Sequence, residues 1–119
     1  MKVVEPKEYS LDEMAMKVFL EAINLAGGPR KLMEYRRLTW LPSLMEAAYS
    51  VVLAHEEKKS EDEIASFLGL ARPAVRNILR ANPDEVMRRL EGKVRSRSHV
   101  AGGLAKLAYQ RIKFREMAP

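Results

Sequence analysis

The chain contains no cysteine, which excludes a disulfide framework and metal sites built on thiolates. Its two histidines, His55 and His99, are isolated from each other and leave little for a zinc centre. No stretch approaches the roughly eighteen uncharged apolar residues of a membrane span, and the N-terminus lacks a signal-peptide pattern. We therefore expect a cytoplasmic protein with no cofactor, metal or membrane partner, which is stabilised by packing.

Recognisable catalytic groups are also missing, because no Ser, His and acid set stands out. The stretch 26–31, AGGPRK, lacks the spacing G-x-x-x-x-G-K-[ST] and the preceding strand of a nucleotide-binding loop. We interpret it as a helix-breaking turn. The acidic pairs Asp62-Glu63 and Asp84-Glu85 fall in expected first helical turns, where they complement the helix dipole. The sequence therefore predicts that the protein is not an enzyme.

Positive charge is concentrated in the second half of the chain. Residues 1–71 hold nine Lys/Arg and twelve Asp/Glu, a net −3, whereas residues 72–119 hold twelve and four, a net +8. Nine of those twelve basic residues are arginines, whose forked donors suit phosphate and base contacts better than lysine does. A one-sided positive field is typical of a phosphate-binding surface. The alternative is a solvated basic surface.

Apolar residues recur at helical spacing along the chain and predict an all-α fold. Helix starts are marked by capping boxes at Ser10/Glu13, Ser43/Glu46 and Ser60/Glu63 and by prolines at Pro29, Pro73 and Pro83. We expect the first helix to stop at Gly27-Gly28, the Ser43 helix to end near Lys59, and a last helix to open at Gly102-Gly103. The predicted divisions are an N-terminal helical region at 1–40, a central helix-turn-helix domain at 41–92, whose motif lies at 60–80, and a basic C-terminal segment and helix at 93–119.

The stretch 60–80, SEDEIASFLGLARPAVRNILR, predicts two short helices joined by a turn from Gly69 to Arg72. Ala65 is small enough for the helices to cross closely, and Gly69 can take the left-handed conformation that ends the first helix. Val75 and Ile78 place the second helix on a core. These four packing residues stand at the relative positions expected for a helix-turn-helix.

On those residues the stretch resembles the helix-turn-helix family of DNA-binding regulators. The resemblance implies a tri-helical core, completed by the helix that precedes the motif, with further N- and C-terminal helices outside it. It also implies that the helix Pro73 to Arg80 enters the major groove of DNA. The chain departs from the family at Ala71, where many members have Ser or Thr, so the second helix lacks its usual side-chain cap.

The outer face of the second helix and the basic segment after it carry the expected DNA contacts. Arginine and asparagine can pair with base edges, and arginine also binds phosphate. The expected base-contacting residues are Arg72, Arg76 and Asn77, and the expected phosphate-contacting residues are Arg80, Arg95 and Arg97. Residues 93–99 are interpreted as a flexible, wing-like basic segment or as a solvated linker. One apolar side of the last helix is expected to dock on the core or on a second copy.

The leading hypothesis is a DNA-binding transcriptional regulator that acts as a homodimer on double-stranded DNA, with half-sites about 34 Å apart. A second hypothesis is a protein-interaction adaptor. Met33 to Trp40 and Ser98 to Tyr109 resemble small archaeal regulatory proteins that accompany KaiC-like ATPases. This resemblance implies an archaeal source, an ATPase signalling partner, and a helix-turn-helix used for protein contacts. RNA binding ranks last, because few aromatic residues in the basic half are available for base stacking.

Overall fold

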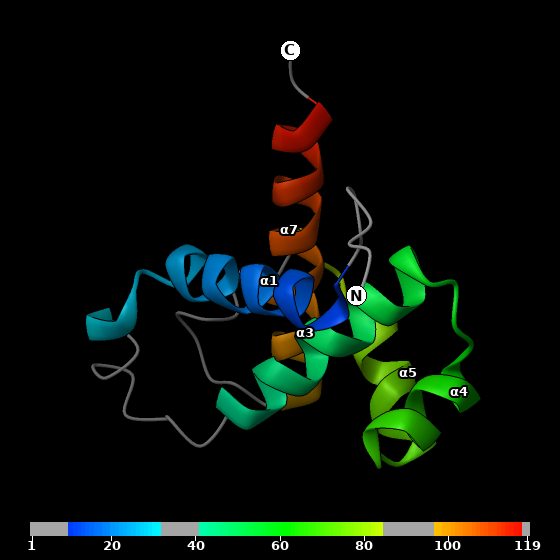
Figure 1. Cartoon of the computed structure of the whole chain (residues 1–119). Coiled ribbons are helices and arrows are strands. Elements are labelled where there is room, and N and C mark those ends of the chain that lie inside the picture. The colour runs from blue at the N-terminus through cyan, green and yellow to red at the C-terminus, as the bar shows by residue number, and fades with distance from the viewer. Residues whose placement is uncertain (1–9, 32–40, 85–96, 118–119) are drawn as a thin grey trace, which may run out of the picture.

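The computed structural model describes residues 10–31, 41–84 and 97–117, and of 97–99 it describes the backbone alone. All regular elements in this part of the chain are helices, which confirms the predicted all-α class. They are α1 (Leu11–Leu25), α3 (Leu41–Glu56), α4 (Glu61–Leu68), α5 (Arg72–Arg80) and α7 (Arg97–Met117) (Figure 1). A further helical turn begins at Pro29, as predicted. The predicted helix after Pro83 lies outside the described residues.

The first helix, α1, begins and ends where the sequence predicts. Ser10 is its N-cap, with the Ser10 hydroxyl accepting a hydrogen bond of 3.3 Å from the Glu13 N–H. Gly27 and Gly28 follow its end with φ angles of +108° and +93°. Because only glycine adopts such angles without strain, the pair stops the helix.

The predicted Ser43/Glu46 capping box is wrong, because α3 begins at Leu41 and Ser43 lies inside its first turn. Pro42 explains the earlier start, since its missing N–H and fixed φ suit a first turn. The helix ends at Glu56, shortly before the expected end near Lys59. Lys58 then takes a left-handed φ of +56°, which turns the chain towards α4.

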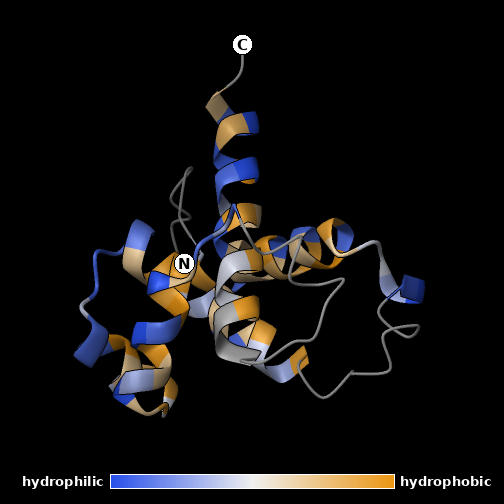
Figure 2. Cartoon of the chain, turned by 180° about the vertical axis from the view of Figure 1, so that it is seen from behind, coloured by the Kyte–Doolittle hydropathy of each residue, from blue (hydrophilic) through white to orange (hydrophobic). Residues whose placement is uncertain are grey.

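The main hydrophobic core lies where α1, α3 and α7 meet, with Ile78 of α5 at its edge. Figure 2 shows the hydrophobic residues concentrated at this junction. Many contact residues are alanines, whose small side chains allow the helix axes to approach closely. The buried set includes Val18, Ala22, Leu44, Ala48, Val51, Leu104, Ala105 and Ala108. The core thus combines residues from all three predicted divisions of the chain, whose boundaries stay a prediction.

The start of α7 differs from the prediction. The helix begins at Arg97 and runs through Gly102 and Gly103 instead of opening at them. A Cβ on Gly102 would stand 2.5 Å from the Ile78 carbonyl oxygen and 2.7 Å from its Cα, so this glycine lets the α5 backbone approach α7. The interpretation of 93–99 as a flexible segment is therefore wrong for 97–99, because an apolar stripe beginning at Val100 holds the helix on the core. Residues 93–96 lie outside the described residues.

A second, smaller cluster holds α4 and α5 against α3. It consists of the buried residues Leu53, Ile64, Ala65 and Val75. The C-terminal end of α5 is also tied to α7, because the Lys106 ammonium donates hydrogen bonds to the carbonyls of Leu79 at 2.7 Å and Ala81 at 2.9 Å. Burial lowers the pKa of Lys106.

Candidate nucleic-acid interface

Helix α4 starts with the capping box that the sequence predicts. The Glu63 N–H donates to the Ser60 hydroxyl at 3.1 Å, and the Ser60 N–H donates to the Glu63 carboxylate at 2.8 Å. The second of these bonds lowers the pKa of Glu63. Glu61 and Asp62 complete an acidic first turn. The capping bonds satisfy backbone donors at this helix start and hold the acidic turn in place.

The turn between α4 and α5 depends on Gly69, which has a left-handed φ of +73° and ψ of +32°. Helix α5 begins at Arg72, one residue before the expected Pro73, which lies in its first turn. Ala71 occupies the N-cap and makes no side-chain capping bond. The start of α5 therefore rests on Pro73 and on packing.

Helix α5 has one buried and one exposed face. Val75 and Ile78 are buried, Val75 in the small cluster and Ile78 in the main core. Asn77 and Arg80 are exposed on the other side, and Arg80 forms no ion pair with any described residue. A strongly amphipathic helix of this kind is held on the core by its apolar face and presents polar donors to solvent on the other face.

The structure brings two predicted base-contacting arginines together with two acids of α4, Asp62, which was expected only to complement the helix dipole, and Glu61, for which the sequence predicted no role. Arg72 Nε lies 3.0 Å from Asp62 Oδ1, and Arg76 Nε lies 3.2 Å from Glu61 Oε1. Both pairs join the first turn of α4 to α5. The Arg72 and Asp62 side chains are 57% and 70% exposed, so water screens this pair and its contribution to stability is small.

The remaining predicted phosphate-contacting residues are not gathered by the described structure. Arg95 lies outside the described residues. Arg97 is the first residue of α7, and its side chain is likewise outside the described part. Their assignment as phosphate contacts stays a prediction.

Two basic residues of α7 are paired with acids from the first half of the chain. Lys113 Nζ lies 3.0 Å from Glu56 Oε2, and Arg115 donates to Glu21 Oε2 at 2.7 Å across 94 residues of sequence. The carboxylate of Glu56 raises the pKa of Lys113. Because these contacts cancel charge locally, the positive surface is narrower than the charge count along the sequence suggests.

A polar cluster joins the end of α3 to α7. The rings of His55 and Tyr109 stack with centroids 5.2 Å apart, and the Tyr109 hydroxyl donates to Glu56 Oε2 at 2.5 Å. That hydrogen bond lowers the pKa of Glu56. Burial, followed by the charges of Lys106 and Lys58, lowers the pKa of His55. These contacts give His55 a packing role against α7.

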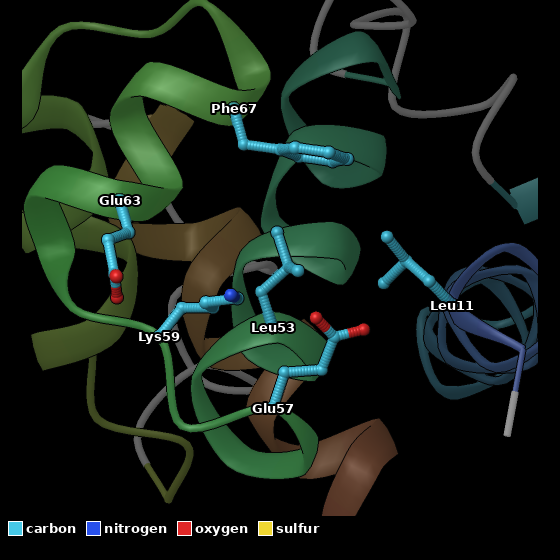
Figure 3. Close-up of a pocket in the computed structure, with 6 residues that line it drawn as sticks. All are labelled: Leu11, Leu53, Glu57, Lys59, Glu63 and Phe67. Carbon is cyan, nitrogen blue, oxygen red and sulfur yellow. The ribbon is translucent and has the colours of Figure 1, made fainter.

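A pocket of about 330 Å³ lies between α1, α3 and α4. Figure 3 shows Leu11 and Leu53 on opposite sides of it, with the Glu57 carboxylate pointing to the space between them. Phe67 of α4 borders it and is largely exposed. None of its described lining residues belongs to α5, so the pocket is separate from the exposed face of that helix.

Within residues 10–31, 41–84 and 97–117, no group of three His, Cys, Asp or Glu side chains is placed to hold a metal ion. The helices of the same ranges are too short or too polar to cross a membrane. No protein-family model, curated protein or solved structure is significantly similar to this chain.

Proposed function

We propose that the protein is a DNA-binding transcriptional regulator that places α5 in the major groove. The observation that carries this proposal is that α5 has one buried, apolar face and one exposed, polar face. Val75 and Ile78 fasten one face to two hydrophobic clusters, while Asn77 and Arg80 are exposed on the other. A rigid helix with outward amide and guanidinium donors has the chemistry needed to pair with base edges and phosphates.

The neighbouring helices support a helix-turn-helix interpretation. Helices α3, α4 and α5 pack against one another pairwise, as the helices of a tri-helical DNA-binding unit do. Ala65 lies in the small cluster between them, and Gly69 makes the left-handed turn that redirects the chain. In this arrangement α4 supports α5 and leaves its outer face accessible.

We assign the residue roles from the position of each side chain on α5 and from whether it can contact DNA. The exposed Arg72–Asp62 pair contributes about 0–1 kcal/mol, so Arg72 remains available to a DNA duplex. The half-buried Arg76 contacts Glu61 through Nε and keeps its terminal N–H donors for DNA. We assign base contacts to Arg72, Arg76 and Asn77, and a phosphate contact to Arg80 at the end of the helix. Arg95 and Arg97 are proposed as further phosphate contacts. A short helix contacts few bases, so we also propose a homodimer that addresses two half-sites about 34 Å apart.

Selection from random duplex DNA at two salt concentrations tests the proposal, with an enriched motif as the expected result. Asn77→Ala should relax preference at one base position and cost about 1–3 kcal/mol of discrimination. Arg80→Ala should weaken all duplexes alike and reduce the salt slope by about 1. Lys17→Ala, on the exposed side of α1, is the control for loss of a positive charge. Failure to enrich any motif would contradict sequence-specific binding.

The second candidate function is a protein-interaction adaptor with an ATPase signalling partner. It is favoured by the C-terminal end of α7, which contacts α1 through Arg115 and then projects beyond the other helices in Figure 1. Phe114 and Met117 on this end are 76% and 80% exposed, and Arg111 beside them is exposed too. Exposed apolar side chains next to a cation suit an acidic partner surface.

The adaptor function predicts a stable complex with an acidic protein and no binding to duplex DNA at low salt. Phe114→Ser should abolish that complex, because it removes the largest apolar side chain from the exposed end of α7. Met45→Ser is the control, since Met45 is an exposed methionine on α3. Equal loss in both variants would argue against docking on α7.

A further inference from the structure

We propose that Glu61 and Asp62 determine the DNA specificity of α5, by orienting Arg76 and Arg72 while cancelling part of their attraction to phosphate. This inference rests on the proposed function. It concerns the balance between sequence-independent and sequence-specific binding at the same surface.

The contact atoms leave the base-pairing end of each arginine available. Each carboxylate approaches Nε, at 3.0 Å in Arg72 and 3.2 Å in Arg76. A guanidinium carries five N–H donors: the Nε–H and one terminal N–H point to one side, and the two terminal nitrogens offer a second pair of N–H groups at the end. The bidentate contact to guanine O6 and N7 can use that terminal fork. The acids therefore restrict the side-chain orientation of both arginines without occupying every donor.

The position of the two acids is itself well supported. They belong to the first turn of α4, which the Ser60/Glu63 capping box holds. Ile64, two residues after Asp62, is fully buried, and the Gly69 turn fixes where α5 starts. Carboxylates on a helical turn that is fixed in this way orient a neighbouring arginine better than carboxylates on a loop would.

The same carboxylates reduce attraction to any duplex. Sequence-independent binding comes from neutralising phosphates with Lys and Arg, and its strength depends on how many are neutralised. An arginine paired with a carboxylate contributes less net positive charge to this attraction. Wild-type α5 therefore has a lower affinity for DNA of any sequence but keeps its oriented donors. This increases the ratio between its affinity for the preferred sequence and its affinity for other sequences.

The test compares the full chain with the double variant Glu61→Gln, Asp62→Asn on two duplexes, the selected motif and a random sequence. For each restored phosphate contact the slope of log K against log salt steepens by about 0.9, which is about an eightfold gain on random DNA at about 0.1 M salt. The motif duplex should gain less, because the arginines lose their orientation. The ratio of the two affinities is therefore expected to fall by several-fold.

The double variant Glu13→Gln, Glu46→Gln is the matched control, because it also removes two negative charges, from exposed positions on α1 and α3. It should leave the affinity ratio unchanged. Circular dichroism checks that each variant is folded, and the NMR signals of the Arg72 and Arg76 Nε–H groups should move in the double variant without any DNA present.

The outcomes separate this inference from the proposed function. A wild-type chain that selects a motif, with an unchanged affinity ratio in the double variant, overturns the role of Glu61 and Asp62 and leaves DNA recognition standing. Equal loss of affinity for both duplexes also overturns it, because the acids would then only hold α5 in place. A wild-type chain that binds no duplex overturns both proposals.

Discussion

The two hydrophobic clusters of this molecule differ in size and in the length of the helices that form them. The cluster between α1, α3 and α7 draws on helices of 15, 16 and 21 residues, whereas the cluster under α4 and α5 has four buried residues. The surface proposed to contact DNA lies on α5, which packs on the smaller cluster through Val75. Its orientation therefore depends on support from the larger one.

Helix α5 is where the two clusters meet. Val75 belongs to the small cluster and Ile78 to the main core, while Gly102 and Lys106 of α7 contact its last turns. The comparison teaches that α7, whose apolar side was expected to dock on the core or on a second copy, packs on the core and positions the proposed reading helix. Changes at this junction should move α5 without touching its exposed face.

The largest expected effect distinguishes the two clusters directly. Leu104→Ala and Ile64→Ala each remove a fully buried side chain and should cost about 2–5 kcal/mol of local or global stability. Leu104→Ala should lower amide hydrogen-exchange protection throughout the chain, because it lies in the main core. Ile64→Ala should lower protection in α4 and α5 only. Equal loss of protection everywhere would show that the clusters unfold as one unit.

The next effect concerns the close approach of α5 to α7. Gly102→Ala should destabilise the protein by about 1–3 kcal/mol in urea unfolding, because the new Cβ would overlap the Ile78 backbone. Gly69→Ala is the comparison, because its new Cβ would meet open space. The backbone at residue 69 has a φ of +73°, and this left-handed conformation costs alanine about 1–2 kcal/mol. A stabilised Gly102→Ala variant would mean that α5 shifts easily on α7.

A smaller effect is expected at the end of α5. Lys106→Met removes the ammonium that donates to the Leu79 and Ala81 carbonyls and should cost about 1–2 kcal/mol. Lys113→Met, which loses an ion pair with Glu56, should cost about 0–1 kcal/mol because that pair is more exposed to water. Thermal unfolding of both variants gives the comparison. Equal costs would deny Lys106 a special role.

The smallest effect is a pH dependence from His55. The folded state lowers its pKa below the ordinary value of 6.5, so the unfolded chain binds more protons as pH falls through that range. Stability should therefore decline between pH 7.5 and about 5.5, and His55→Gln should flatten this decline. Urea unfolding at both pH values measures it. An unchanged slope in His55→Gln would assign the decline to another group.

Local signals predicted the helix ends well where all the interacting atoms lie within a few residues. Ser60 and Glu63 form both bonds of their capping box, and Gly69 takes the left-handed conformation. The same signal misled at Ser43, because Pro42 allows α3 to start earlier. Gly102 also misled, since a glycine that permits close packing looks in sequence like a glycine that opens a helix.

The candidate site was only partly visible in the sequence. The exposed face of α5 follows from helical periodicity, because every third or fourth residue shares a side. The pairing of Arg76 with Glu61 was not visible, since these residues are 15 positions apart on different helices. Nor was the cancellation of basic charge in α7 by Glu21 and Glu56.

The sequence by itself determined that this chain is helical, where α1 stops, how α4 begins, and which side of α5 is apolar. These features depend on backbone conformation and on hydrogen bonds between near neighbours. Only the tertiary structure decided that α7 supports α5 through Gly102 and Lys106, and that acids of α4 contact the arginines of α5. Such contacts depend on how whole helices pack, and no local pattern encodes the distance between residues on different helices.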